Sequence, residues 1–215
     1  MFWKTASTAS LICTSQTIDV MTWLEEMNWV LGIRSEIWTL VMRGVTDLGG
    51  TWFFLLFLPV VFFAGRRATF VRLLVLLGLT ALLNAHLKAV YALPRPDAVY
   101  QLVEFSGSTF PSGHAQYAAA LWLWFAWELR SLPVWIGCSL VVVGVAGSRV
   151  YLGVHYPRDV IAGVLVGVSL LVYYRWLLDG SSEREGTSLP WVLGFALAFQ
   201  AAWLWLLAGD RTDTA

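Results

Sequence analysis

Six runs of apolar residues, separated by short polar connections, occupy most of this chain. They cover residues 51–64, 70–90, 114–129, 133–151, 159–178 and 190–208. A membrane-spanning helix needs about 20 mainly apolar residues, so most runs are long enough to cross a bilayer and the first is short. We therefore expect an all-α integral membrane protein, folded as one bundle of six transmembrane helices.

The chain before the first run has a different pattern. Residues 1–20 are small and polar, and they lack the apolar core of a secretory signal peptide. Residues 21–46 combine apolar side chains at helical spacing with several charges, which is typical of helices lying in the membrane interface. We predict three parts: a polar tail with interfacial amphipathic helices in 1–47, a six-helix transmembrane domain in 48–208 and a polar tail in 209–215.

Composition supports the membrane assignment and excludes other classes. Only 13% of the residues are charged, against about 25% in soluble domains, and 58% are hydrophobic. The thirteen tryptophans suit the membrane–water interface. The formal net charge is zero, so no overall field favours nucleic acid, and we expect membrane lipids and no nucleic acid as partners.

Alternating crossings of the membrane bring the unusual polar residues to one face. The second run ends near Lys88, and the third begins near His114 on the same side. The third and fourth runs form a hairpin, so the chain returns to that side near Arg149. Arginines on the two faces nearly balance, so charge alone leaves the orientation open. The residues expected to meet are Lys88, Arg95, Ser112, His114, Arg149, His155 and Asp159.

Two of the polar clusters contain features of an anion site. Prolines on both sides of Arg95 restrict the backbone, while Lys88 ends an apolar helix. The Pro-Ser-Gly-His stretch, with Ser112, Gly113 and His114, opens the third run, and free N–H groups at a helix start bind anions. The alternatives are a snorkelling lysine with a loop arginine, and an ordinary helix entry with an interfacial histidine.

The third cluster contains Arg149, His155 and Asp159. Asp159 is close enough in sequence to accept a hydrogen bond from one imidazole N–H of His155, leaving the other nitrogen free to attack an electrophile. Alternatively, Asp159 only stabilises a helix N-terminus. His86 points to a different helix face from Lys88, and we interpret it as a packing or interfacial residue.

The three clusters together resemble the signature of the type 2 phosphatidic acid phosphatase superfamily. The spacing is Lys-x6-Arg-Pro, then Pro-Ser-Gly-His, then Ser-Arg-x5-His-x3-Asp, and no position departs from the pattern. The resemblance spans residues 88–159 by motif, and this family is related in active-site pattern to glucose-6-phosphatase and the vanadium haloperoxidases. It implies a membrane phosphatase for a lipid phosphate or pyrophosphate, such as phosphatidate, phosphatidylglycerophosphate or undecaprenyl pyrophosphate.

The resemblance also implies roles for individual residues. His155 is the expected nucleophile, forming a phosphohistidine, with His114 as general acid and base and Asp159 orienting His155. The residues expected to bind the phosphoryl oxygens are Lys88, Arg95, Ser112, Gly113 and Arg149. No cofactor and no metal are expected. For most bacterial relatives the site faces the periplasm, so we expect a bacterial inner-membrane protein with that orientation; the sequence leaves the oligomeric state open.

Three alternatives compete with this hypothesis. His114, His155 and Asp159 resemble a two-histidine, one-carboxylate metal set, but three neighbouring cations would repel a divalent ion. A non-hydrolytic protein that binds or transports lipid phosphates would need the cations and not the histidines. A phosphatase for a soluble phosphate ester would carry the same motifs, so the motifs leave that possibility open.

Overall fold

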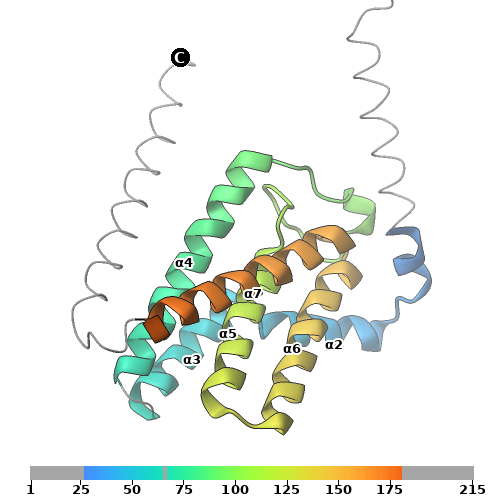
Figure 1. The fold of residues 1–215 in the computed structure, drawn as a ribbon. Helices are drawn as coiled ribbons and strands as arrows, with labels where there is room; N and C mark the ends of the chain where they lie inside the picture. The colour runs from blue at the N-terminus through green and yellow to red at the C-terminus, as the bar shows by residue number, and fades with distance from the viewer. Residues whose placement is uncertain (1–26, 65–66, 181–215) are drawn as a thin grey trace, which may run out of the picture.

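The computed structural model describes residues 27–64 and 67–180, and its regular elements are helices (Figure 1). No strand occurs in these two ranges, which agrees with the predicted all-α class. In chain order the elements are α2 (Glu36–Asp47), α3 (Thr51–Ala64), α4 (Arg67–Tyr91), the 3₁₀ turn η1 (Ala98–Tyr100), α5 (Gly113–Leu129), α6 (Leu132–Tyr151) and α7 (Pro157–Gly180).

Within the described residues, three helices are long and apolar enough to cross a membrane, namely α4, α6 and α7. Helix α2 and the Trp52–Phe63 part of α3 meet at a bend of 53°, and this pair qualifies as a fourth, broken span. Helix α5 has 17 residues, slightly fewer than the about 20 of a typical span. The chain is therefore an integral membrane protein. The predicted last span, 190–208, lies outside the described residues, so the total of six stays a prediction.

Helix α2 is amphipathic, as the sequence pattern predicts. Its start is capped by Ser35, whose hydroxyl accepts a hydrogen bond from the Trp38 backbone N–H at 3.3 Å. Ile37 and Leu40 are 77% and 74% exposed, whereas Thr46 is buried and α2 packs on α6. The interfacial placement of this region and the division at residues 47/48 stay predictions, and residues 1–26 lie outside the described part.

Small residues let α5 pack closely against α7, which crosses it in Figure 1. A Cβ added at Gly163 would lie 2.5 Å from the Ser112 carbonyl oxygen, and one at Gly167 would lie 2.5 Å from the Gln116 carbonyl oxygen. Glycines four residues apart on one helix face allow such close backbone contact in membranes. This contact fixes the first turns of α5, where the Pro-Ser-Gly-His stretch lies.

A buried polar cluster joins α4 to the same end of α5. The Asn84 side-chain amide donates to Gln116 Oε1 at 2.8 Å, and the Gln116 amide donates to the Thr80 carbonyl oxygen at 3.3 Å. All three residues are buried. Buried polar groups need such partners, so Gln116, which interrupts the third apolar run, is explained by this connection. The end of α4 and the start of α5 are thereby held together.

Candidate active site

Four helix ends and one long loop meet at one end of the bundle. The Ser112 backbone N–H donates to the Asp159 carbonyl oxygen at 2.9 Å, joining the start of α5 to the first turn of α7. Lys88, in the last turn of α4, donates to the Ser108 carbonyl oxygen at 2.6 Å. Lys88 and His114 both lie within electrostatic range of Arg95 and Arg149. The structure thus brings together the residues predicted from the three motifs.

His155 lies in the connection between α6 and α7 and is only 2% exposed. Its Nδ1 is 3.1 Å from the Thr109 hydroxyl, and that hydroxyl donates to Asp159 Oδ2 at 2.6 Å. The direct distance from His155 Nδ1 to Asp159 Oδ2 is 3.8 Å, too long for a hydrogen bond. The predicted pairing of His155 with Asp159 therefore runs through Thr109, a residue that the sequence motifs do not include.

Arg95 is held beside the other nitrogen of His155. Its Nη1 donates to the Val154 carbonyl oxygen at 2.8 Å and lies 3.4 Å from His155 Nε2. Its Nε donates to the Gly107 carbonyl oxygen at 3.0 Å, and its Nη2 donates to the Ser108 carbonyl oxygen at 3.3 Å. These bonds fix the guanidinium where it can contact an oxygen on any phosphorus atom that approaches Nε2.

Arg149, near the end of α6, is 1% exposed and has unused donors. Its Nη1 donates to the Thr46 hydroxyl at 3.1 Å, but its Nε and Nη2 have no hydrogen-bond partner. The hydroxyl of Ser112, at the N-cap of α5, is also buried without a partner and forms no side-chain cap. Leaving a buried donor unpaired is unfavourable by about 1–3 kcal/mol or more. Such donors on two facing elements are well suited to binding the oxygens of an anion.

The ring of Phe105 covers these cations. Its centroid lies 4.7 Å from the Arg149 guanidinium carbon and 5.4 Å from that of Arg95. The same ring meets the His114 imidazole edge-on, with centroids 6.1 Å apart and an interplanar angle of 86°. Phe105 is 42% exposed, so it borders both the cationic site and its surroundings.

Burial makes the neutral form of His155 the stable one. It lowers the pKa of His155 to about 4, and the positive charges of Arg149 and Arg95 act in the same direction. Asp159 opposes this shift without cancelling it. At neutral pH the imidazole is therefore unprotonated on one nitrogen, as a nucleophile requires.

Residues 69–182, more than half of the 215-residue chain, match the family model of the PAP2 superfamily. A phosphatidylglycerophosphatase B from Bacillus subtilis (strain 168) is 40% identical over 158 residues, which cover 67% of this chain and 75% of the relative. The chain belongs to the PAP2 superfamily.

Two solved structures are similar in fold. One is a transmembrane PAP2-type phosphatidylglycerolphosphate phosphatase from Bacillus subtilis, with a TM-score of 0.68, 29% identity and coverage of 84% of this chain and 91% of that chain. The other is Aquifex aeolicus LpxE, with a TM-score of 0.64, 22% identity and coverage of 71% and 93%. The predicted family, the membrane-embedded helical fold and the phosphatase class are confirmed.

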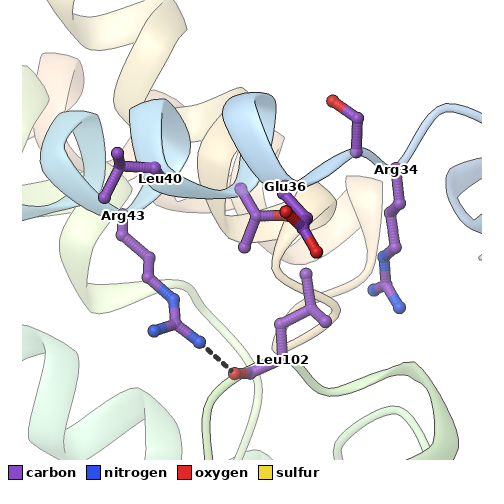
Figure 2. A pocket seen from close by; sticks show the side chains of 7 residues that line it. Arg34, Glu36, Leu40, Arg43 and Leu102 are labelled. Carbon is purple, nitrogen blue, oxygen red and sulfur yellow. Dashed lines mark hydrogen bonds between the residues drawn. The ribbon is translucent and has the colours of Figure 1, made fainter.

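The PAP2 match begins after α2, but α2 and Arg34, two positions before it, support the site. Arg34 donates through Nη2 to the carbonyl oxygens of Tyr100 and, at 3.2 Å, Tyr151. Arg43 donates to the Leu102 carbonyl oxygen at 3.0 Å (Figure 2). Between these two arginines lies an open groove of about 420 Å³, lined also by Ser35, Glu36, Thr39 and Leu40. None of the predicted site residues lines it.

Sequence reasoning missed three side chains of this PAP2 site: Thr109, Phe105 and Thr46. Thr109 stands two positions before the Pro-Ser-Gly-His stretch, and this closeness to a motif could have marked it as a candidate site residue. Phe105 and Thr46 belong to no motif, and long-range contacts alone bring them to Arg149. In the part of the chain that the structure describes, no three His, Cys, Asp or Glu side chains form a candidate metal site.

Proposed function

We propose that this PAP2 protein hydrolyses the terminal phosphomonoester of a glycerophospholipid, with phosphatidylglycerophosphate as the preferred substrate, through a phosphohistidine on His155. The observation that carries the proposal is the buried pair of unpaired donors, Arg149 and Ser112, in the same site as the neutral His155. The names of the Bacillus subtilis relative and structure support the substrate. Phosphatidate and undecaprenyl pyrophosphate are the competing substrates.

In the first step, the lone pair of His155 Nε2 attacks phosphorus, and the bond from phosphorus to the lipid oxygen breaks. His114, whose protonated form is favoured by the negative charge of the bound phosphate, donates its proton to that departing oxygen. In the second step, His114 accepts a proton from water, whose oxygen attacks phosphorus; the N–P bond breaks and inorganic phosphate leaves. In-line transfer of this kind is catalysed mainly by positioning and by electrostatic stabilisation of the phosphoryl oxygens.

Three cations and a helix start stabilise the transferring group. A phosphomonoester carries about −1.5 to −2 charges at neutral pH. Lys88, Arg95 and Arg149 neutralise this charge, while Ser112 and the Gly113 backbone N–H donate hydrogen bonds to the phosphoryl oxygens. Gly113 lies against α4, where a Cβ would be 3.2 Å from Asn84 Oδ1, so a side chain at this position would crowd the helix start.

We further propose that the protein crosses a bacterial inner membrane with six helices and that its site faces the periplasm. The described bundle supports this in part, since the site lies at one end. An ion pair between Arg175 and Glu128 lies near the other ends of α7 and α5. That end would then face the cytoplasm, where arginine is enriched beside transmembrane helices.

Removing divalent metals should leave the activity unchanged. We expect purified protein in mixed vesicles to release phosphate from phosphatidylglycerophosphate at the same rate, within about twofold, with and without excess chelator, because protein cations supply the positive charge. Parallel assays with phosphatidate, undecaprenyl pyrophosphate and glycerol 3-phosphate test the substrate. A rate that collapses on chelation and returns with a divalent ion would contradict the metal-free mechanism.

The imidazole of His155 should titrate in acid, well below the usual value near 6.5. Its pKa is lowered to about 4, so the neutral, nucleophilic form persists as the pH falls through 6 and is lost only near 4. The groups within electrostatic range of it are Arg149, Arg95, Asp159 and His114. Nitrogen-15 shifts of histidine-labelled, substrate-free protein measure this directly, with His155→Gln assigning the signal. A midpoint near 6.5 would refute the expectation.

A further inference from the structure

The Thr109 side chain occupies a position between the two groups whose partnership the mechanism needs. It is fully buried; its hydroxyl oxygen lies 3.1 Å from His155 Nδ1, and the hydroxyl O–H donates to Asp159 Oδ2 at 2.6 Å. Asp159 Oδ2 also accepts the Tyr156 backbone N–H at 3.0 Å. His155 Nδ1 and Asp159 Oδ2 are 3.8 Å apart, too far for a direct hydrogen bond.

Proton counting fixes the direction of this chain of contacts. A threonine hydroxyl has one proton, and here that proton is directed to Asp159. Towards His155 the hydroxyl can therefore only accept, so Nδ1 must carry the imidazole proton. A neutral imidazole has one N–H, which leaves the lone pair on Nε2, the nitrogen beside Arg95.

We propose that Thr109 is a positioning residue that selects the reactive tautomer of His155 and connects its ring to Asp159. This inference rests on the proposed nucleophilic role of His155. When Nε2 forms the bond to phosphorus and the lipid oxygen leaves, the ring becomes positively charged and keeps its proton on Nδ1. Thr109 keeps its own proton as well, and its oxygen accepts a stronger hydrogen bond from the charged ring.

The hydroxyl is not needed to fix the loop backbone. The Thr109 backbone N–H already donates to the Leu93 carbonyl oxygen at 2.9 Å. The neighbouring hydroxyl, that of Ser108, is directed to the Phe110 carbonyl oxygen at 3.5 Å and takes no part in the chain of contacts. If Thr109 serves only in packing, valine, which has the same shape, should replace it. If Thr109 serves through its hydrogen bonds, serine, which keeps the hydroxyl, should replace it.

The test compares Thr109→Val with Thr109→Ser and uses Ser108→Ala as the matched control. With phosphatidylglycerophosphate in mixed vesicles, we expect valine to lower kcat about 10²-fold with KM changed less than about threefold, by analogy with other orienting partners of a catalytic histidine. Serine should stay within about fivefold of wild type, and the control should be unchanged. Valine with wild-type kcat would overturn the inference.

Nitrogen-15 spectra of substrate-free protein give a second readout that does not depend on turnover, and its wild-type and serine arms do not depend on the folding of the valine variant. We expect wild-type and Thr109→Ser protein to hold His155 as the Nδ1–H tautomer, and folded Thr109→Val to show a mixture. An Nε2–H tautomer in wild type would overturn the inference. Full activity in His155→Gln would instead refute the proposed nucleophile, which separates the two failures.

Discussion

Phosphate release by His155→Gln should fall by about 10³-fold or more, because the first bond to phosphorus can no longer form. Glutamine keeps a polar side chain of similar length but lacks a basic nitrogen. The cations Arg95 and Arg149 stay in place, so we expect inorganic phosphate to bind the variant with little change. Single-turnover assays with labelled substrate measure the rate, and acid-labile, protein-bound phosphate should disappear.

The third histidine of the chain supplies the matched control. His86 lies two positions before Lys88 on α4 and is half-buried outside the motifs. His86→Gln should retain the wild-type rate within about twofold, since the proposed mechanism gives this side chain no role. Wild-type rates in both variants would exclude His155 as the nucleophile.

The second large effect is expected at Gly153, between Arg149 and His155. Its backbone is left-handed, with φ of 72°, and a Cβ there would lie 1.7 Å from the Tyr100 carbonyl oxygen. Alanine therefore cannot enter without moving either the α6–α7 connection or the loop that holds η1. We expect Gly153→Ala to lower the midpoint of thermal unfolding in detergent by about 5 °C or more and the activity by about 10²-fold.

Two other glycines distinguish the effect of the left-handed backbone from the effect of the contact with Tyr100. Gly107 also has a positive φ, 83°, but open space surrounds the position that a Cβ would take, so Gly107→Ala should show only the left-handed penalty of about 1–2 kcal/mol. Gly147, inside α6, has open space as well, and alanine there should be neutral or slightly stabilising. If Gly153→Ala behaves like Gly107→Ala, the contact with Tyr100 is unimportant.

Much of the site could be predicted from the sequence because its chemistry is concentrated in short stretches. Lys88, His114 and Arg149 stand at the ends of apolar runs, and alternation of those runs across a membrane was enough to place them on one face. The roles of individual residues came from the family resemblance and are tested by the variants above. The helix order from α3 to α7 follows the same apolar pattern.

Other features could not be predicted because they depend on packing between distant segments. Phe105 reaches Arg149 only through the path of the loop after η1, which has no periodic pattern. Helices α2 and α3, joined at a bend, form one candidate span. The hydropathy pattern instead predicts an interfacial helix followed by a separate short span. Thr109 lies between His155 and Asp159 because the two side chains are 3.8 Å apart and do not bond directly. Sequence spacing cannot predict a separation to that precision.

The links from α2 and Arg34 bear on how this enzyme can be shortened. A chain trimmed to begin at residue 69 would retain all three motifs. It would lose the Thr46 hydroxyl that accepts from Arg149 and the arginines that hold Tyr100 and Leu102. We therefore expect the minimal working unit to be longer than the portion that matches the family model, and grafting the motifs onto another helical scaffold would also require a counterpart of α2.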